Sequence, residues 1–187
     1  IKYLWKIALG SGRRPAGGGQ SWCRPPFAIV LRMWRRRAAG QEPLCGILGD
    51  NMKRLSILGS TGSIGRQTLE VCDLFPADFT VVALTAQQNV ELLAAQAKQY
   101  RPSMVAIGDP DCYNILKEAL SGLDCAVLAG AEGVAACAAC DTADLVVGAI
   151  SGIAGLTPVL AAIEQGKDVA LANKEVLVAA GSVVMER

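Results

Sequence analysis

The chain has 187 residues, of which 52% are hydrophobic and 19% are charged, with a formal net charge of +1. This length allows one domain with an appendage, and the hydrophobic content excludes a chain that is disordered throughout. No run of bilayer-spanning length lacks a charge or a turn signal, so we expect no membrane partner.

The first 51 residues differ in composition from the rest. They hold nine Lys and Arg against two acids, whereas residues 52–187 hold nine against fifteen. We interpret residues 1–51 as a low-order basic extension upstream of a natural start at Met52. The alternatives are a transit peptide, because the segment is rich in Arg and poor in acids, and a nucleic-acid arm at RMWRRR. A solvated basic run also explains that motif, so we expect no nucleic-acid partner.

Seven cysteines, an odd number, are scattered along the chain. Five lie after residue 52 within apolar patterns, which is typical of reduced cysteines and favours a cytoplasmic protein. Cys137 and Cys140 form a C-A-A-C motif, but a metal or redox site needs a second pair, a His or a helix N-terminus after a strand. The chain has no His, so we interpret the pair as small core residues.

Strand-like and helix-like segments alternate from residue 52 onwards. Short apolar runs predict strands over 54–59, 79–85, 103–108, 124–130, 143–151 and 168–173. Helical spacing of apolar residues predicts helices over 63–75, 89–100, 109–120, 131–140, 155–166 and 174–187. This alternation, with nearly continuous apolar strands, predicts an α/β fold: a doubly wound parallel sheet with helices on both faces.

A glycine-rich loop joins the first predicted strand to the first predicted helix. Gly59, Gly62 and Gly65 can provide a tight turn, close approach of the backbone to a pyrophosphate, and close packing of helix on strand. The helix N-terminus attracts phosphate, and Thr61 and Ser63 add hydroxyl donors. The loop predicts a Rossmann-like dinucleotide site, with a flavodoxin-like turn without a ligand as the alternative. A P-loop is excluded because no Lys follows the last glycine.

The end of the second predicted strand indicates which dinucleotide binds. Enzymes that use NAD usually place an acid there to hold the ribose 2′-hydroxyl. Residues 81–90 contain no acid, and Thr85, Gln87, Gln88 and Asn89 offer hydrogen-bond donors. A 2′-phosphate would therefore not be repelled, which favours NADPH.

A polar triplet, Asn173 to Glu175, interrupts an apolar run after the last predicted strand. A buried segment does not carry Lys and Glu together unless both find partners. Either Asn173 caps a helix with two charges in its first turn, or the triplet faces a ligand at the carboxyl end of the sheet.

Four segments together resemble the N-terminal domain of the 1-deoxy-D-xylulose 5-phosphate reductoisomerase family: MKRLSILGSTGSIGRQTLEV, VVALTAQQNV, AISGIAGLTPVLAAIEQGK and LANKEVLVAAG. The resemblance covers residues 52–187. It implies an NADPH-binding Rossmann-like domain, followed in the family by a catalytic and a C-terminal domain in a homodimer. The implied reaction rearranges and reduces 1-deoxy-D-xylulose 5-phosphate to 2-C-methyl-D-erythritol 4-phosphate, in non-mevalonate isoprenoid biosynthesis.

The resemblance also implies which residues meet each ligand. The cofactor contacts would be Thr61, Gly62, Ser63, Ile64, Gln87, Gln88, Asn89, Asn173 and Glu175. Lys174 would hold the sugar-phosphate substrate. The family usually has Gly-Lys-Asn at 87–89, so two of these three positions differ in this chain.

The family's divalent metal, Mg²⁺ or Mn²⁺, is implied to lie in the catalytic domain, on an Asp and two Glu. We find no suitable acidic cluster in this chain, and therefore expect neither a metal site nor a complete catalytic site. We interpret the chain as an N-terminal fragment that is inactive alone. The alternatives are a short-chain dehydrogenase, for which Tyr113 and Lys117 supply a Y-x-x-x-K spacing, and a non-catalytic NAD(P)-sensing module.

Overall fold

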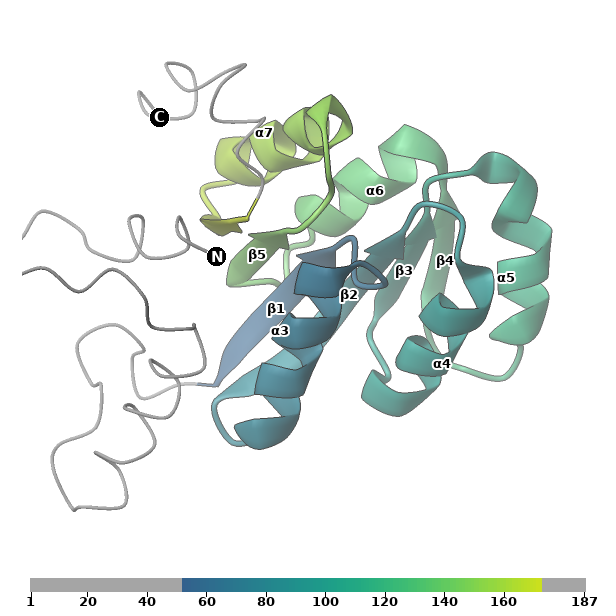
Figure 1. Cartoon of the computed structure of the whole chain (residues 1–187), viewed down its shortest axis with the longest axis horizontal. Coiled ribbons are helices and arrows are strands. Elements are labelled where there is room, and N and C mark those ends of the chain that lie inside the picture. The colour runs from purple at the N-terminus through teal and green to yellow at the C-terminus, as the bar shows by residue number, and fades with distance from the viewer. Residues whose placement is uncertain (1–51, 173–187) are drawn as a thin grey trace, which may run out of the picture. The chain divides into compact units, whose positions relative to one another are not determined.

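The computed structural model describes residues 52–172, which form one parallel sheet flanked by helices (Figure 1). Neighbouring strands are all parallel, in the order β4-β3-β2-β1-β5-β6. The strands are β1 Lys53–Leu58, β2 Phe79–Ala86, β3 Met104–Ile107, β4 Ala126–Ala129, β5 Leu145–Gly148 and β6 Asp168–Leu171. The predicted doubly wound sheet is confirmed.

The helices follow the predicted alternation, with shifts at their ends. They are α3 Ser63–Leu74, α4 Val90–Tyr100, α5 Tyr113–Ala119, α6 Gly130–Ala138 and α7 Leu156–Glu164, with 3-10 turns η1 Pro110–Cys112 and η2 Ile153–Gly155. The segment predicted as one helix over 109–120 begins as η1 and continues as α5, and Asp109 caps η1 by accepting a hydrogen bond from the Asp111 N–H. The helix predicted over 174–187 lies outside the described residues.

The helices cover both faces of the sheet (Figure 1). Helices α3, α4 and α5 pack on one face, where their buried residues meet Ile57 of β1. Helices α6 and α7 pack on the other face, where they meet Leu58. Consecutive side chains of a strand point to opposite faces, so one apolar strand supplies both cores. This explains why the strands read as nearly continuous apolar runs.

The order of the strands creates a switch point between β1 and β5. From β1 the chain moves outward through β2 and β3 to β4, and α6 then crosses back to β5 on the opposite side of β1. In open α/β sheets, ligands bind at the carboxyl ends of the strands beside such a reversal. The glycine loop leaves β1 at this place.

An ion pair joins β1 to β5 at the other end of the same strands. Arg54 donates from Nε to Asp144 at 3.0 Å and from its terminal nitrogen at 2.7 Å, and its backbone N–H donates to the same carboxylate at 2.9 Å. The hydrogen bond from the guanidinium, the largest cause, lowers the pKa of Asp144 to about 2. This fork of hydrogen bonds fixes the amino ends of these two neighbouring strands.

The C-A-A-C motif lies at the end of α6, and both thiols are free and buried. Burial raises the pKa of Cys137 to about 12, so its reactive thiolate form is suppressed. The Cys137 carbonyl accepts a 2.7 Å hydrogen bond from the buried Ser56 hydroxyl of β1. These surroundings agree with the interpretation of both cysteines as core residues.

Candidate functional site

The first glycine of the loop, Gly59, lies close to the segment that follows β5. Gly59 has φ +82, a conformation open to glycine and strained for other residues. A Cβ on Gly59 would lie 3.0 Å from the Ala149 carbonyl oxygen, in the segment that follows β5. Gly59 therefore makes the tight turn that the sequence predicts, at the switch point itself.

The third glycine lets α3 pack closely on the end of β1. A Cβ on Gly65 would overlap the carbonyl oxygen of Gly59 and would lie 2.5 Å from the Cα of Ser60. Backbone atoms cannot move aside as a flexible side chain can, so a side chain is excluded here. The predicted role of Gly65 in helix–strand packing agrees with this geometry.

Gly62, by contrast, is exposed and has an ordinary extended backbone, with φ −73 and ψ 171. A Cβ there would be 3.3 Å from the Gly59 carbonyl oxygen, a tight but tolerable contact. The fold alone therefore does not demand glycine at this position. A side chain on Gly62 would instead extend from the loop towards any group that approaches its surface.

The start of α3 is open to an anion. Gly62 is the N-cap residue, and no side chain of the described residues caps the helix. The N–H groups of a first helical turn have no intrahelical partner, and they carry about half a positive charge. Ser63 is exposed, while Thr61 and Ile64 are partly buried. This arrangement can receive a phosphate on backbone donors.

Thr85 supports the loop and does not face a ligand. It is fully buried, and its Oγ1 accepts a 2.9 Å hydrogen bond from the Gly59 N–H. Its carbonyl oxygen accepts another from the Ser60 N–H at 2.8 Å. The expectation that Thr85 donates to a 2′-phosphate is therefore wrong, because its hydroxyl lies beneath the loop.

Two further residues of this region, Ser60 and Gln96, were missed from the sequence. Both are buried, and their side chains hydrogen-bond to each other at 2.7 Å. The signal was the position of Gln96: it lies on the buried side of α4, beside Leu93 and Ala97. A polar residue on the apolar side of a helix needs a partner, and here the partner is the glycine loop.

The three residues after β2, numbers 87–89, are exposed at the carboxyl end of the sheet. Asn89 uses its side-chain oxygen to cap α4, accepting a 3.0 Å hydrogen bond from the Leu92 N–H. The predicted helix start is confirmed. The amide nitrogen of Asn89 is not used by this cap and can still donate.

An acid lies beside Gln88, although the strand end itself has none. The Nε2 atom of Gln88 donates to Asp109 at 3.0 Å. Asp109 follows β3, so the sheet brings it next to the loop that follows β2. Gln87 lies over Gly108, where a Cβ would be 2.8 Å from the Gln87 carboxamide carbon. Asp109 lies outside residues 81–90, so the sequence around the end of β2 does not reveal this neighbour.

The predicted triplet of Asn173, Lys174 and Glu175 lies outside the described residues. The structure describes the chain as far as Ala172, directly after β6. Within residues 52–172, no group of three or more His, Cys, Asp or Glu could hold a metal ion. Across the same range, no helix is long and apolar enough to cross a membrane.

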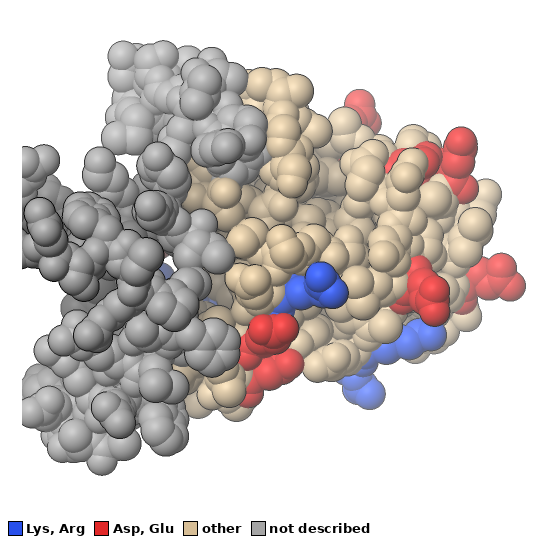
Figure 2. All heavy atoms as spheres, viewed as in Figure 1, with Lys and Arg blue, Asp and Glu red and all other residues tan. Residues whose placement is uncertain are grey.

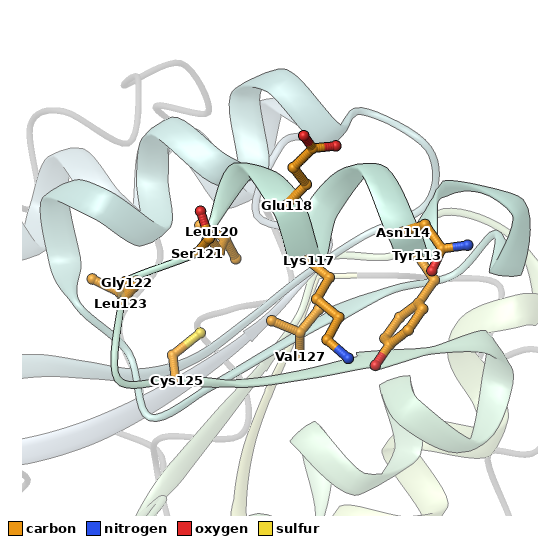
Figure 3. Close-up of a pocket in the computed structure, with 10 residues that line it drawn as sticks. All are labelled: Tyr113, Asn114, Lys117, Glu118, Leu120, Ser121, Gly122, Leu123, Cys125 and Val127. Atoms are coloured by element: carbon orange, nitrogen blue, oxygen red, sulfur yellow. The ribbon is translucent and has the colours of Figure 1, made fainter.

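Tyr113 and Lys117 lie together on α5, in a hollow beside β4 (Figure 3). The ammonium of Lys117 is 5.5 Å from the centre of the Tyr113 ring, a cation–π contact. The hollow is lined by α5, the turn after it and β4, and by no residue of the glycine loop. The Y-x-x-x-K spacing therefore has a local role on this helix and does not support a short-chain dehydrogenase.

On the face shown in Figure 2, a few basic side chains lie in the middle and lower part, and acidic side chains lie in the centre and on the right. The described residues on this face do not form a continuous basic surface of the kind that binds nucleic acid. The loop geometry is thus the feature of this domain that best fits a ligand.

Known sequences match the same part of the chain. A family model described as 1-deoxy-D-xylulose 5-phosphate reductoisomerase matches residues 55–181. The reductoisomerase of Crocosphaera subtropica is 52% identical over 136 residues, and that of a Synechococcus strain is 54% identical over 140. Each match covers 72% of this chain and 34% of the relative. The chain spans about a third of the length of these curated relatives.

Solved structures show the same similarity. The reductoisomerase of Zymomonas mobilis in complex with NADPH is 44% identical, with a TM-score of 0.69 over 73% of this chain and 36% of that one. A reductoisomerase in complex with NADPH, fosmidomycin and magnesium is 41% identical, with a TM-score of 0.70 over 72% and 33%. Both similarities extend over sequence as well as fold.

Proposed function

The chain belongs to the 1-deoxy-D-xylulose 5-phosphate reductoisomerase family, and we propose that residues 52–187 form the NADPH-binding part of such an enzyme. The observation that carries this proposal is the glycine loop at the switch point between β1 and β5, where α3 starts without a side-chain cap. NADPH in two similar solved structures supports the choice of cofactor.

Three features of the loop fit the pyrophosphate of a dinucleotide. The turn at Gly59 ends the strand, the exposed backbone at Gly62 leaves room above the loop, and the first turn of α3 supplies N–H donors. The hydroxyl groups of Thr61 and Ser63 add donors at the same place. In this proposal these groups bind and orient the phosphates.

The 2′-phosphate is proposed to lie over residues 87–89. Gln87, Gln88 and Asn89 are exposed there and carry amide donors. Their location at the end of β2, next to β1 in the sheet, is where such folds hold the adenosine ribose. We therefore propose that the chain prefers NADPH to NADH.

The whole enzyme is proposed to rearrange and reduce 1-deoxy-D-xylulose 5-phosphate to 2-C-methyl-D-erythritol 4-phosphate. NADPH supplies the hydride for the reduction. Asn173 and Glu175 are proposed to contact the cofactor and Lys174 the substrate phosphate, on the strength of the LANKEVL motif. The family's divalent metal, Mg²⁺ or Mn²⁺, is assigned to the catalytic domain, and magnesium is present in similar solved structures.

We further propose a homodimer for the full-length enzyme and a cytoplasmic location. The compartment is supported by the five free thiols of the described residues, because cytoplasmic cysteines stay reduced. With the family shown, neither a short-chain dehydrogenase nor an NAD(P)-sensing module is proposed.

Two measurements test the proposed function. Calorimetry with the 187-residue chain should show tighter binding of NADPH than of NADH, and equal affinities would remove the NADPH assignment. A chimera of residues 52–187 with a reductoisomerase catalytic domain should turn over the substrate with Mg²⁺, whereas the chain alone should not oxidise NADPH. In the chimera, Lys174→Ala should impair substrate use far more than NADPH binding. Steady-state activity of the chain alone would contradict this division of the site.

A further inference from the structure

A buried carboxamide holds the glycine loop from behind. The Oε1 atom of Gln96 accepts a 2.7 Å hydrogen bond from the Ser60 hydroxyl, and its Nε2 donates to the Ser60 carbonyl oxygen at 3.1 Å. Gln96 is 6% exposed and Ser60 is completely buried. Both ends of one side chain are therefore satisfied by a single loop residue, away from water.

The neighbouring strand completes this support. The Ser60 N–H donates to the Thr85 carbonyl oxygen, and the Gly59 N–H donates to the Thr85 hydroxyl. Every polar group of Ser60 thus has a partner in β2 or α4. The conformation of Gly59 and Ser60 is fixed by buried hydrogen bonds, and the uncapped donors at the start of α3 follow three residues later.

Helix α4 connects the two predicted contact points of the dinucleotide. Asn89 caps α4 next to the exposed strand end, and Gln96 follows seven residues later. Seven residues are about two helical turns, so both lie on the same side of the helix, about 10 Å apart along its axis. One short helix therefore carries the ribose-side segment at its start and holds the phosphate loop from its middle.

We propose that Gln96 is a positioning residue for the pyrophosphate. Its two hydrogen bonds to Ser60 keep the glycine loop in the shape that receives phosphate, and they fix that loop relative to the segment after β2. The inference rests on the proposed function of the loop and adds a residue that never touches the cofactor. Without Gln96, the buried Ser60 carbonyl loses its partner, and the Ser60 hydroxyl keeps only its longer, 3.2 Å hydrogen bond to the Thr85 carbonyl oxygen. The loop must then rearrange to satisfy the carbonyl. Binding would then have to restore the loop's shape.

The test uses Gln96→Met in the 187-residue chain, because Met has a similar length and cannot form either hydrogen bond. Calorimetry should show NADPH binding about tenfold weaker, as expected for two lost hydrogen bonds. Binding of adenosine 2′-monophosphate, which has the 2′-phosphate but no pyrophosphate, should change by less than about twofold. A general loss of structure would weaken both ligands.

Gln99→Met is the matched control, since Gln99 is an exposed residue of the same helix. It should leave the affinity for both ligands unchanged. Ser60→Ala serves as a smaller change if the Met variant does not fold, and it should also weaken NADPH selectively. The double variant with Ser60→Ala and Gln96→Met should bind NADPH only slightly more weakly than Gln96→Met alone, because both substitutions remove the same contact.

Two results would overturn the inference, and they are distinguishable. If the wild-type chain binds NADPH and both Gln96→Met and Ser60→Ala bind it equally well, Gln96 does not position the loop, while the proposed function stands. If the wild-type chain binds no NADPH, the proposed function fails and the role of Gln96 fails with it.

Discussion

Strands β1 and β5 lie side by side in the sheet, and the two ends of this pair are built differently. At the amino end, Arg54 of β1 and Asp144, directly before β5, form four hydrogen bonds, three of them to the Asp144 carboxylate. At the carboxyl end the glycine loop turns away, and backbone donors at the start of α3 stay uncapped by the described side chains. The comparison indicates that one end serves stability and the other serves a ligand.

Gly65 is an expected exception to this division between stability and ligand binding, because it lies at the ligand end and yet is needed for folding. Gly65→Ala places a methyl group against the backbone of Gly59 and Ser60, which should lower the free energy of unfolding by about 3 kcal/mol. Urea denaturation of the 187-residue chain measures it. A variant as stable as wild type would show that α3 can move away from β1 without cost.

Gly62 should show the division most clearly. Gly62→Val meets no positive φ but brings its Cβ 3.3 Å from the Gly59 carbonyl oxygen, so the free energy of unfolding should fall by only about 1 kcal/mol. NADPH binding should weaken more than about tenfold, since a branched side chain would fill the space over the loop that a pyrophosphate needs. Denaturation and calorimetry on the same protein separate the two effects. Unchanged affinity would place the phosphate site elsewhere.

Asp144 should show the opposite pattern, with an effect on stability and none on binding. Its folded pKa is lowered to about 2, below the usual value of about 3.9. Its contribution is therefore present above pH 4 and is lost as the pH falls towards 2. Because both partners are partly exposed, Asp144→Asn should cost only about 1 kcal/mol at pH 7.

The check for Asp144 is the difference in unfolding free energy between wild type and Asp144→Asn, measured from pH 7 down to pH 2. This difference should shrink towards zero across the acidic range, and NADPH affinity at pH 7 should stay within about twofold. A difference independent of pH would mean that the carboxylate charge contributes nothing to the pair.

Much of the fold could be predicted because its signals are local. Apolar runs alternating with helical spacing identified the six strands, and the helical segments predicted to begin at Asn89 and Asp109 are capped by these residues. The ends of the segments were less accurate: the strand predicted over 143–151 is only Leu145–Gly148. Ala149 and Ile150, which follow the strand, are also apolar, so composition does not mark where the strand ends.

The site was predicted less completely, because its support comes from residues distant in sequence. The glycines could be read directly, since all three lie within seven residues between a strand and a helix. Thr85 was misassigned because its donor group gives no sign of burial, and Ser60 and Gln96 were missed because 36 residues separate them. Asp109 reaches Gln88 from the following βα unit, 21 residues away, so only the pairing of β2 with β3 makes them neighbours.

Replacing Asp109, the acid beside Gln88, should have the smallest effect of these changes. It tests whether the 2′-phosphate lies at this part of the ligand end. If a 2′-phosphate lies over Gln88, the Asp109 carboxylate repels it and weakens the preference for NADPH. Asp109→Asn keeps an oxygen that can cap η1, and should raise the ratio of the NADH to the NADPH dissociation constant about threefold, as expected for screened surface charges. Asp111→Asn removes the same charge without the hydrogen bond to Gln88 and should change the ratio less. If Asp109→Asn leaves the ratio unchanged, the 2′-phosphate does not lie beside Gln88, and the ligand end reaches only as far as the glycine loop.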